Sequence, residues 1–154
     1  MIFVTLGSQK FQFNRLLKAV DELDTEEEIF AQIGYSDYKP QHYKYKEFLD
    51  REEFDAWEEK ADIVITHGGT GAIIGAVKKG KKVIAVPRLA KYGEHVDDHQ
   101  IQLIKQFKDL NLIYACVDGD LQRALEVVKN TTYNEYKSNT DKIIKSLEEF
   151  IEGK

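Results

Sequence analysis

The sequence predicts an α/β fold built on a doubly wound, mostly parallel sheet. Two observations support that prediction. Short runs of branched apolar residues alternate with segments in which apolar residues recur at helical spacing. The runs are apolar almost throughout, which is typical of strands covered on both faces of a parallel sheet. A chain of 154 residues can form one sizeable core, and we expect residues 1–154 to form a single domain.

The first half of the chain opens with a buried strand over residues 2–6 (IFVTL). Residues 13–23 predict a helix, because apolar residues recur there every three or four positions opposite charged ones. A second strand is expected over 27–34, and a short third strand over 42–49, where the pattern is mixed. Residues 51–61 predict a short helix.

The second half continues the alternation. In order, we expect a strand at 62–66, a helix at 71–79, a strand at 82–86, a helix at 98–110, a strand at 112–117, and helices at 120–130 and about 134–152. Gly80 stops the first of these helices, and Asp118 or Asp120 caps the helix at 120–130. The inward residues of the helix at 98–110 are expected to be Ile101, Leu103, Ile104 and Phe107.

Composition excludes several classes of protein. A net charge of −5 argues against a nucleic-acid binder, which needs clustered Lys and Arg. No run of about eighteen apolar residues is present, so we expect no transmembrane span. The first strand begins at once, without a basic region or cleavage site, so we expect no signal peptide. The single cysteine, Cys116, lies in an apolar run and predicts a buried, reduced thiol in the cytoplasm.

Ligands of open parallel sheets bind outside the carboxyl ends of the strands. The loops that follow Leu6, Thr66 and Val86 all lie at that edge. In the first loop, Gly7 and Ser8 place bare amides and a hydroxyl at a strand-to-helix turn. An ordinary tight turn and a phosphate-binding loop explain that pair equally well.

The second loop is His67-Gly68-Gly69-Thr70-Gly71, which leads directly into a helix. The first amides of a helix have no partners within it, and with the helix dipole they suit a diphosphate or a sugar oxygen. Close packing of the helix on the sheet is the alternative, and we favour the ligand interpretation. The dinucleotide pattern GxGxxG fails at Ile74. The segment GAVKKGKK imitates a P-loop but lacks its Ser or Thr and ends a helix.

The third loop, residues 87–100, is long and polar, which is more typical of a functional loop than of a connection. Within it His95, Asp97, Asp98 and His99 could ligate a divalent metal, or an aspartate could cap the next helix. We expect no metal, because no further cluster of His or Cys supplies the remaining ligands. Polar groups that hydrogen-bond sugar hydroxyls explain the cluster better.

Together these loops resemble a known family, the PssE-type subunits of exopolysaccharide and capsular glycosyltransferases. Such subunits are similar to the soluble subunit of the eukaryotic two-protein enzyme that adds the second GlcNAc to the dolichol-linked glycan. They are also similar to the C-terminal, donor-binding half of the peptidoglycan glycosyltransferase MurG. Three segments carry the resemblance, which runs from Met1 to about Val128: IFVTLGSQKFQFNRLLKAVDEL, ADIVITHGGTGAIIGAVKKGKKVIAVPR and GEHVDDHQ.

The resemblance implies a Rossmann-like half of a GT-B glycosyltransferase that binds a UDP-sugar without a cofactor. The implied donor-binding residues are Gly7, Ser8, His67, Gly68, Gly69, Thr70, Gly71, Pro87, Arg88, Asp98, His99 and Gln100. The glycine amides would surround the diphosphate, Pro87 and Arg88 would lie near the nucleotide, and the His99-Gln100 pair would reach the donor sugar. A membrane-anchored PssD-like subunit would bind a lipid-linked saccharide acceptor and supply the catalytic base. The chain would then be cytoplasmic, held at the inner face of the membrane by that partner, and the transfer would be inverting.

One position departs from the family pattern. Members usually carry a glutamate on the helix after the glycine loop, where it holds the ribose hydroxyls, and here that position is Gly75. Another acid such as Glu94 could take over this role, or nucleotide affinity could be weaker. A third possibility is a chain that has lost catalysis and keeps a supporting role. A mid-helix glycine costs about 1 kcal/mol relative to alanine, so its reason is informative.

Overall fold

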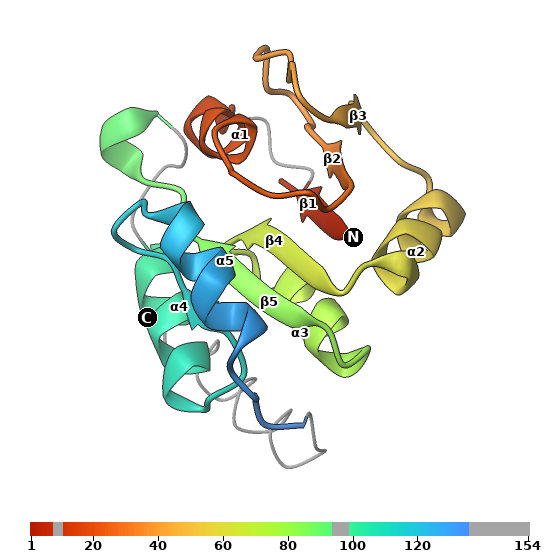
Figure 1. Ribbon diagram of the computed structural model, residues 1–154. Helices are drawn as coiled ribbons and strands as arrows, with labels where there is room; N and C mark the ends of the chain where they lie inside the picture. Colours follow the sequence, from red (N-terminus) through yellow and green to blue (C-terminus); the bar gives the residue numbers. More distant parts are fainter. Residues whose placement is uncertain (8–10, 94–98, 136–154) are drawn as a thin grey trace.

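The computed structural model describes residues 1–7, 11–93 and 99–135. In that part of the chain six strands form one sheet in the order β3-β2-β1-β4-β5-β6 (Figure 1), and every strand pairing is parallel. The strands are β1 (Ile2–Thr5), β2 (Ile29–Gln32), β3 (Lys44–Lys46), β4 (Ile63–His67), β5 (Lys82–Val86) and β6 (Tyr114–Ala115). The helices are α1 (Asn14–Asp21), α2 (Arg51–Lys60), α3 (Thr70–Lys78), α4 (His99–Asp109) and α5 (Leu121–Lys129), with a 3₁₀ helix η1 (Ala90–Tyr92). The predicted α/β fold is confirmed.

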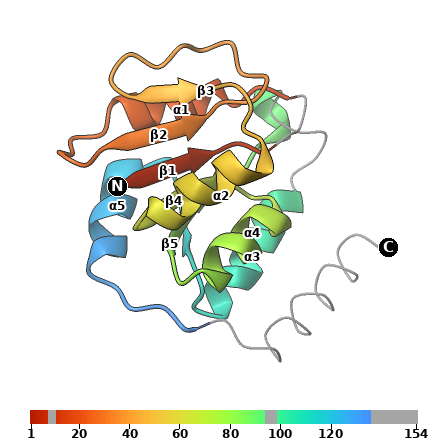
Figure 2. The same cartoon turned by 90° about the vertical axis from the view of Figure 1, so that its right-hand side faces the viewer.

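Helices cover both faces of the sheet because the central strands are apolar on both faces. Along β1, Ile2 and Val4 enter one core with α1 and α5, while Phe3 enters the other with α3 and α4. Figures 1 and 2 show α1 and α5 against one face and α2, α3 and α4 against the other. Because helices cover both faces of such a sheet, its ligands bind at the ends of the strands.

Helix ends follow the predicted signals. The carboxylate of Asp120 accepts a hydrogen bond from the Arg123 amide and caps α5. Gly80 follows the end of α3 with a left-handed φ of 74°. The buried face of α1 consists of Leu16, Leu17 and Val20, as its spacing predicts.

The two edge strands are shorter than expected. Instead of residues 42–49, β3 spans only Lys44–Lys46, and all three of its side chains are exposed. Instead of residues 112–117, β6 spans only Tyr114–Ala115. An edge strand has one neighbour, so burial selects its side chains less strictly and its sequence pattern is weaker.

Two further predictions concern helices. Ile101 was expected to point inward from α4, but it is only half-buried, and Gln100 is buried instead. Gln100 thus takes a buried place that was expected of an apolar residue, and the inner face of α4 is polar at its amino end. The expected helix at about 134–152 lies almost wholly outside the described residues, and Asn134 and Glu135 are not helical.

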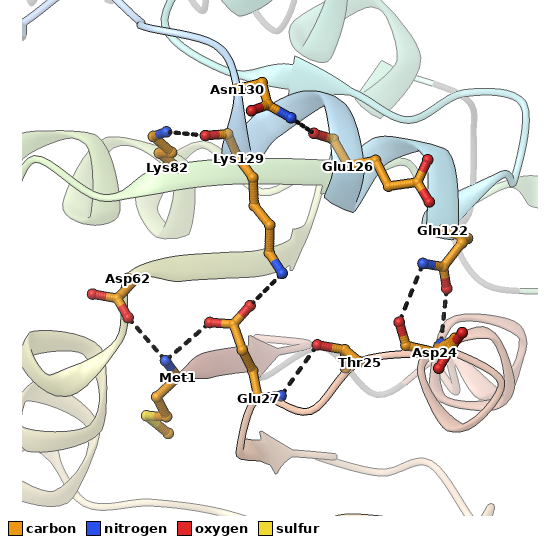
Figure 3. Close-up of polar contacts among 10 residues, drawn as sticks. All are labelled: Met1, Asp24, Thr25, Glu27, Asp62, Lys82, Gln122, Glu126, Lys129 and Asn130. Atoms are coloured by element: carbon orange, nitrogen blue, oxygen red, sulfur yellow. Dashed lines mark hydrogen bonds and ion pairs between the residues drawn. The ribbon is translucent and has the colours of Figure 1, made fainter.

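The amino-end edge of the sheet is closed by ion pairs (Figure 3). The Met1 amino group lies 2.9 Å from Asp62 Oδ2 and 3.3 Å from Glu27 Oε1, and the other oxygen of Glu27 lies 2.8 Å from Lys129 Nζ. Glu27 thereby joins β1 to α5. Ion pairs therefore link the elements at the amino edge, and the three loops predicted to bind a ligand lie at the carboxyl edge.

None of the helices in the described part of the chain has the length and apolar character needed to cross a bilayer.

Candidate functional site

The candidate site lies where three neighbouring strands end. Thr5 of β1 pairs in register with Thr66 of β4, and Thr66 pairs with Ala85 of β5. The three loops that follow these strands therefore leave the sheet side by side, as the sequence predicted. What the sequence did not reveal is that side chains join all three loops.

The His67 ring fills the space between the first two loops. A Cβ added at Gly7 would lie 2.5 Å from His67 Nε2, and one added at Gly69 would lie 2.2 Å from His67 Cε1. Both distances are shorter than real Cβ contacts allow, so both positions need glycine. His67 is itself buried, with 6% of its surface exposed, and its ring packs between Gly7 and Gly69.

Gln100, the second residue of α4, joins the second loop to the third. Its Oε1 accepts hydrogen bonds from the backbone amides of Gly68 at 3.1 Å and Arg88 at 2.9 Å. Its Nε2 lies 3.4 Å from Nδ1 of His67. A Cβ on Gly68 would lie 2.6 Å from Gln100 Cβ, so the lack of a side chain at Gly68 lets α4 pack closely against the loop. The Gln100 amide is engaged with protein, and contact with a donor sugar would require it to exchange these bonds.

Arg88 joins the third loop to the first. One guanidinium nitrogen donates to the carbonyl of Leu6 at 2.6 Å and the other to that of Phe11 at 2.8 Å. The side chain is 1% exposed, and its Cζ lies 5.0 Å from the centroid of the Phe13 ring. Arg88 therefore holds both ends of the first loop from within, rather than presenting its charge to solvent.

The first turn of α3 forms the open part of the site. Gly69 is its N-cap, and among the described residues no side chain caps this helix end and no acid lies in its first turn. Thr70 is half-buried and Gly71 is exposed, with nothing within 4 Å of the place a Gly71 Cβ would take. Packing accounts for Gly68 and Gly69, but it does not account for Gly71. None of the residues that the structure describes covers the positive end of α3, which suits an anion.

The remaining predicted residues have other outcomes. Pro87 is buried, and its carbonyl accepts a hydrogen bond from Arg15 at 3.0 Å. His99 begins α4 and is half-buried. Several predicted residues lie outside the described part of the chain, namely Ser8, Glu94, His95, Asp97 and Asp98. Three of the four candidate metal ligands, His95, Asp97 and Asp98, are among them. The described residues hold no group of three His, Cys, Asp or Glu side chains that could bind a metal ion.

Sequence reasoning missed most of the exposed apolar side chains around this edge. Most of the large exposed apolar residues that the structure describes follow the carboxyl end of a strand: Phe11, Tyr35, Phe48, Tyr92 and Val117. The rings of Tyr35 and Phe48 contact each other edge to face at 5.1 Å. An open cavity of about 730 Å³ lies between α1 and η1, with Phe11 and Tyr92 in its lining. Large apolar residues directly after strands were the available signal.

Cys116 does not contribute a nucleophile. It is 1% exposed, which confirms the predicted burial, and that burial raises the pKa of its thiol to about 11. A thiol with so high a pKa stays protonated at neutral pH and is a poor nucleophile.

A parallel sheet in this strand order, with glycine-rich turns at its carboxyl ends, is a Rossmann-like nucleotide-binding architecture. The chain belongs to the glycosyltransferase family 28 C-terminal domain family, whose model matches residues 1–152. It is 29% identical over 126 residues to the UDP-N-acetylglucosamine transferase subunit ALG13 of Homo sapiens. That match covers 75% of this chain and 11% of the human protein.

Solved glycosyltransferase structures share the fold. MurG of Acinetobacter baumannii superposes with a TM-score of 0.54 at 20% identity, over 84% of this chain and 41% of that one. The calicheamicin glycosyltransferase CalG4 gives 0.60 at 18% identity, over 82% of this chain and 34% of that one. The chain spans well under half of each of these proteins. The shared fold confirms the predicted Rossmann-like, GT-B type of fold.

Proposed function

We propose that this chain is the donor-binding subunit of a two-component glycosyltransferase. It would bind a UDP-sugar and transfer the hexose, with inversion, to a lipid-linked saccharide held by a membrane-anchored, PssD-like partner. The setting would be exopolysaccharide or capsule synthesis at the inner face of the membrane. The human relative is by name a subunit of a UDP-N-acetylglucosamine transferase, which supports a sugar nucleotide as donor.

The observation that carries this proposal is the joining of three loops around an open helix end. His67, Gln100 and Arg88 fasten the loops to one another, and the first turn of α3 lies beside them without a side-chain cap. A site held by buried side chains needs little rearrangement when the ligand arrives. The ligand that suits exposed backbone amides at a helix N-terminus is a phosphate group, here the diphosphate of UDP.

The chemistry follows from where negative charge develops. When the bond between sugar and diphosphate breaks, the departing UDP gains charge next to the amides of Thr70 and Gly71. Backbone amides and a helix dipole fixed in place before the reaction stabilise that charge without reorganising. We therefore expect UDP to bind without added metal, and binding that required magnesium would count against the proposal.

The acceptor half is assigned to a partner. The human relative is by name a subunit of a transferase, which supports a second chain in the enzyme. The apolar rim at the carboxyl edge, which includes Tyr35, Phe48 and Tyr92, suits a second protein surface placed over the site. The catalytic base is expected on that partner.

Calorimetric titration of the full chain with UDP tests the donor site directly. Saturable binding in the presence of a chelator is the expected result. Co-expression with a membrane-anchored, PssD-like subunit then tests sugar transfer. The assignment would be overturned if the chain bound no UDP, with or without the chelator, or if it carried stoichiometric zinc.

A non-catalytic supporting subunit is the second candidate, and Gly75 favours it. A Cβ at Gly75 would meet no atom of the described residues within 4 Å, so their packing does not require glycine at this position. Gly75→Glu restores the side chain expected from the resemblance. If this chain holds the donor, Gly75→Glu should strengthen UDP binding; if it only supports the transferase, UDP affinity should stay negligible in both forms.

A further inference from the structure

Beneath the first loop lies a row of buried polar side chains in an otherwise apolar sheet. Gln32 of β2, Thr5 of β1 and Thr66 of β4 stand in register across three adjacent strands. Their exposed fractions are 7%, 1% and 0%. Buried polar groups are costly unless they are hydrogen-bonded, so each member of the row needs a reason.

Two members of the row bind the turn that begins the first loop. Thr5 Oγ1 donates to Gln32 Oε1 at 2.7 Å and accepts from the Gly7 amide at 3.4 Å. Gln32 Nε2 donates to the Gly7 carbonyl at 3.3 Å. The two side chains thus form a closed ring of hydrogen bonds with both polar backbone groups of one residue.

The residue they hold has a backbone conformation that favours glycine. Gly7 has a φ of +71°, in the left-handed region that glycine adopts readily and other residues rarely adopt. His67 packs against Gly7 from the second loop, as its 2.5 Å approach to an added Cβ shows. The turn is therefore fixed by β2 on one side and by β4 on the other.

We propose that Thr5 and Gln32 are positioning residues that hold the Gly7 turn in the shape required to bind the donor diphosphate. This inference rests on the proposed function. Neither side chain touches the ligand: both act through Gly7, whose conformation sets the direction in which the chain leaves β1. One of the two positioning residues, Gln32, lies on β2, and the loop that follows β2 is not one of the three loops of the candidate site.

Thr66 provides a matched control within the same row. Its hydroxyl is buried and makes no hydrogen bond with any residue that the structure describes. Thr5→Val and Thr66→Val are the same substitution at neighbouring register positions and equal depth. They differ in that only the first removes hydrogen bonds to the turn.

The test measures UDP affinity by calorimetry on the full chain, together with the thermal unfolding midpoint of each variant. Thr5→Val and Gln32→Met should each weaken UDP binding about five- to tenfold, the equivalent of one lost hydrogen bond. Thr5→Ser, which keeps the hydroxyl, should restore wild-type affinity. Thr66→Val should bind UDP like the wild type.

The outcomes separate this inference from the proposed function. Wild-type chain that fails to bind UDP overturns both. Wild-type chain that binds UDP, with Thr5→Val and Gln32→Met binding equally well, overturns the positioning role alone. Equal losses in Thr5→Val and Thr66→Val would also overturn it, because general loosening of the sheet would then explain the effect. In the double variant the two losses should not add, since both substitutions break one ring of bonds.

Discussion

Replacing Gln100 by alanine should loosen two loops at once. The Gln100 side chain is 4% exposed, and its Oε1 is the acceptor for the buried amides of Gly68 and Arg88. Without it both amides lose their partner in a place that water does not reach. Each unsatisfied buried donor costs about 1–3 kcal/mol, so we expect a loss of about 2–6 kcal/mol in the free energy of unfolding.

Urea unfolding followed by circular dichroism measures this loss. Gln102→Ala is the matched control, because it is the same substitution on the same helix at an exposed position, where about 0.5 kcal/mol or less is expected. Gln100→Met fills the same space without an acceptor and should be nearly as destabilising as alanine. That comparison separates the hydrogen bonds from the volume.

The hydrogen bonds of Gln100 would not stabilise the fold as predicted if Gln100→Ala unfolded at the same urea concentration as Gln102→Ala. The same prediction would be refuted if Gln100→Met recovered most of the loss, since volume would then explain the effect. In the predicted case UDP affinity should fall together with stability, because Gly68 and Arg88 begin two of the loops that surround the site.

The remaining predictions concern glycines and the amino edge. Gly75→Ala should stabilise the chain by about 1 kcal/mol, because the helix gains propensity and the added Cβ meets nothing; an unfolding midpoint equal to wild type would contradict this. Gly7→Ala should destabilise it by at least about 1–2 kcal/mol in the same assay, since alanine there adopts a left-handed φ and meets the His67 ring. The ion pairs with Lys129 and the Met1 amino group hold the pKa of Glu27 below its ordinary value, so its contribution is present at neutral pH and lost as pH falls through the folded-state pKa. Glu27→Gln should accordingly cost up to about 1 kcal/mol at neutral pH and nothing in acid, and a difference that did not shrink on acidification would rule out this account.

Much of the fold could be read from the sequence because burial on both faces leaves a strong pattern. The central strands β1, β4 and β5 appear as apolar runs, and the cap at Asp120 and the stop at Gly80 are local signals. The edge strands β3 and β6 were overestimated, because one-sided pairing selects side chains weakly.

The site was only partly predictable. Parallel topology alone placed the three loops at one edge, and the structure brings them together there as predicted. The contacts within the site were harder to predict: the sequence indicates Arg88 and Gln100 only as ligand contacts, and the structure shows that both also hydrogen-bond to backbone. Thr5 and Gln32 carried no signal at all, since a single polar residue near the end of a strand is common.

The amino-acid sequence alone predicts the class of fold, the order of strands and helices along the chain, and the edge of the sheet at which polar and glycine-rich loops gather. Those features depend on periodicity and on local backbone preference, which neighbouring residues encode. Which side chains join the loops to one another is known only from the folded chain. Gln100 is 32 residues from Gly68 and Arg88 is 82 from Leu6, and contacts across such separations arise only when the helices pack on the sheet.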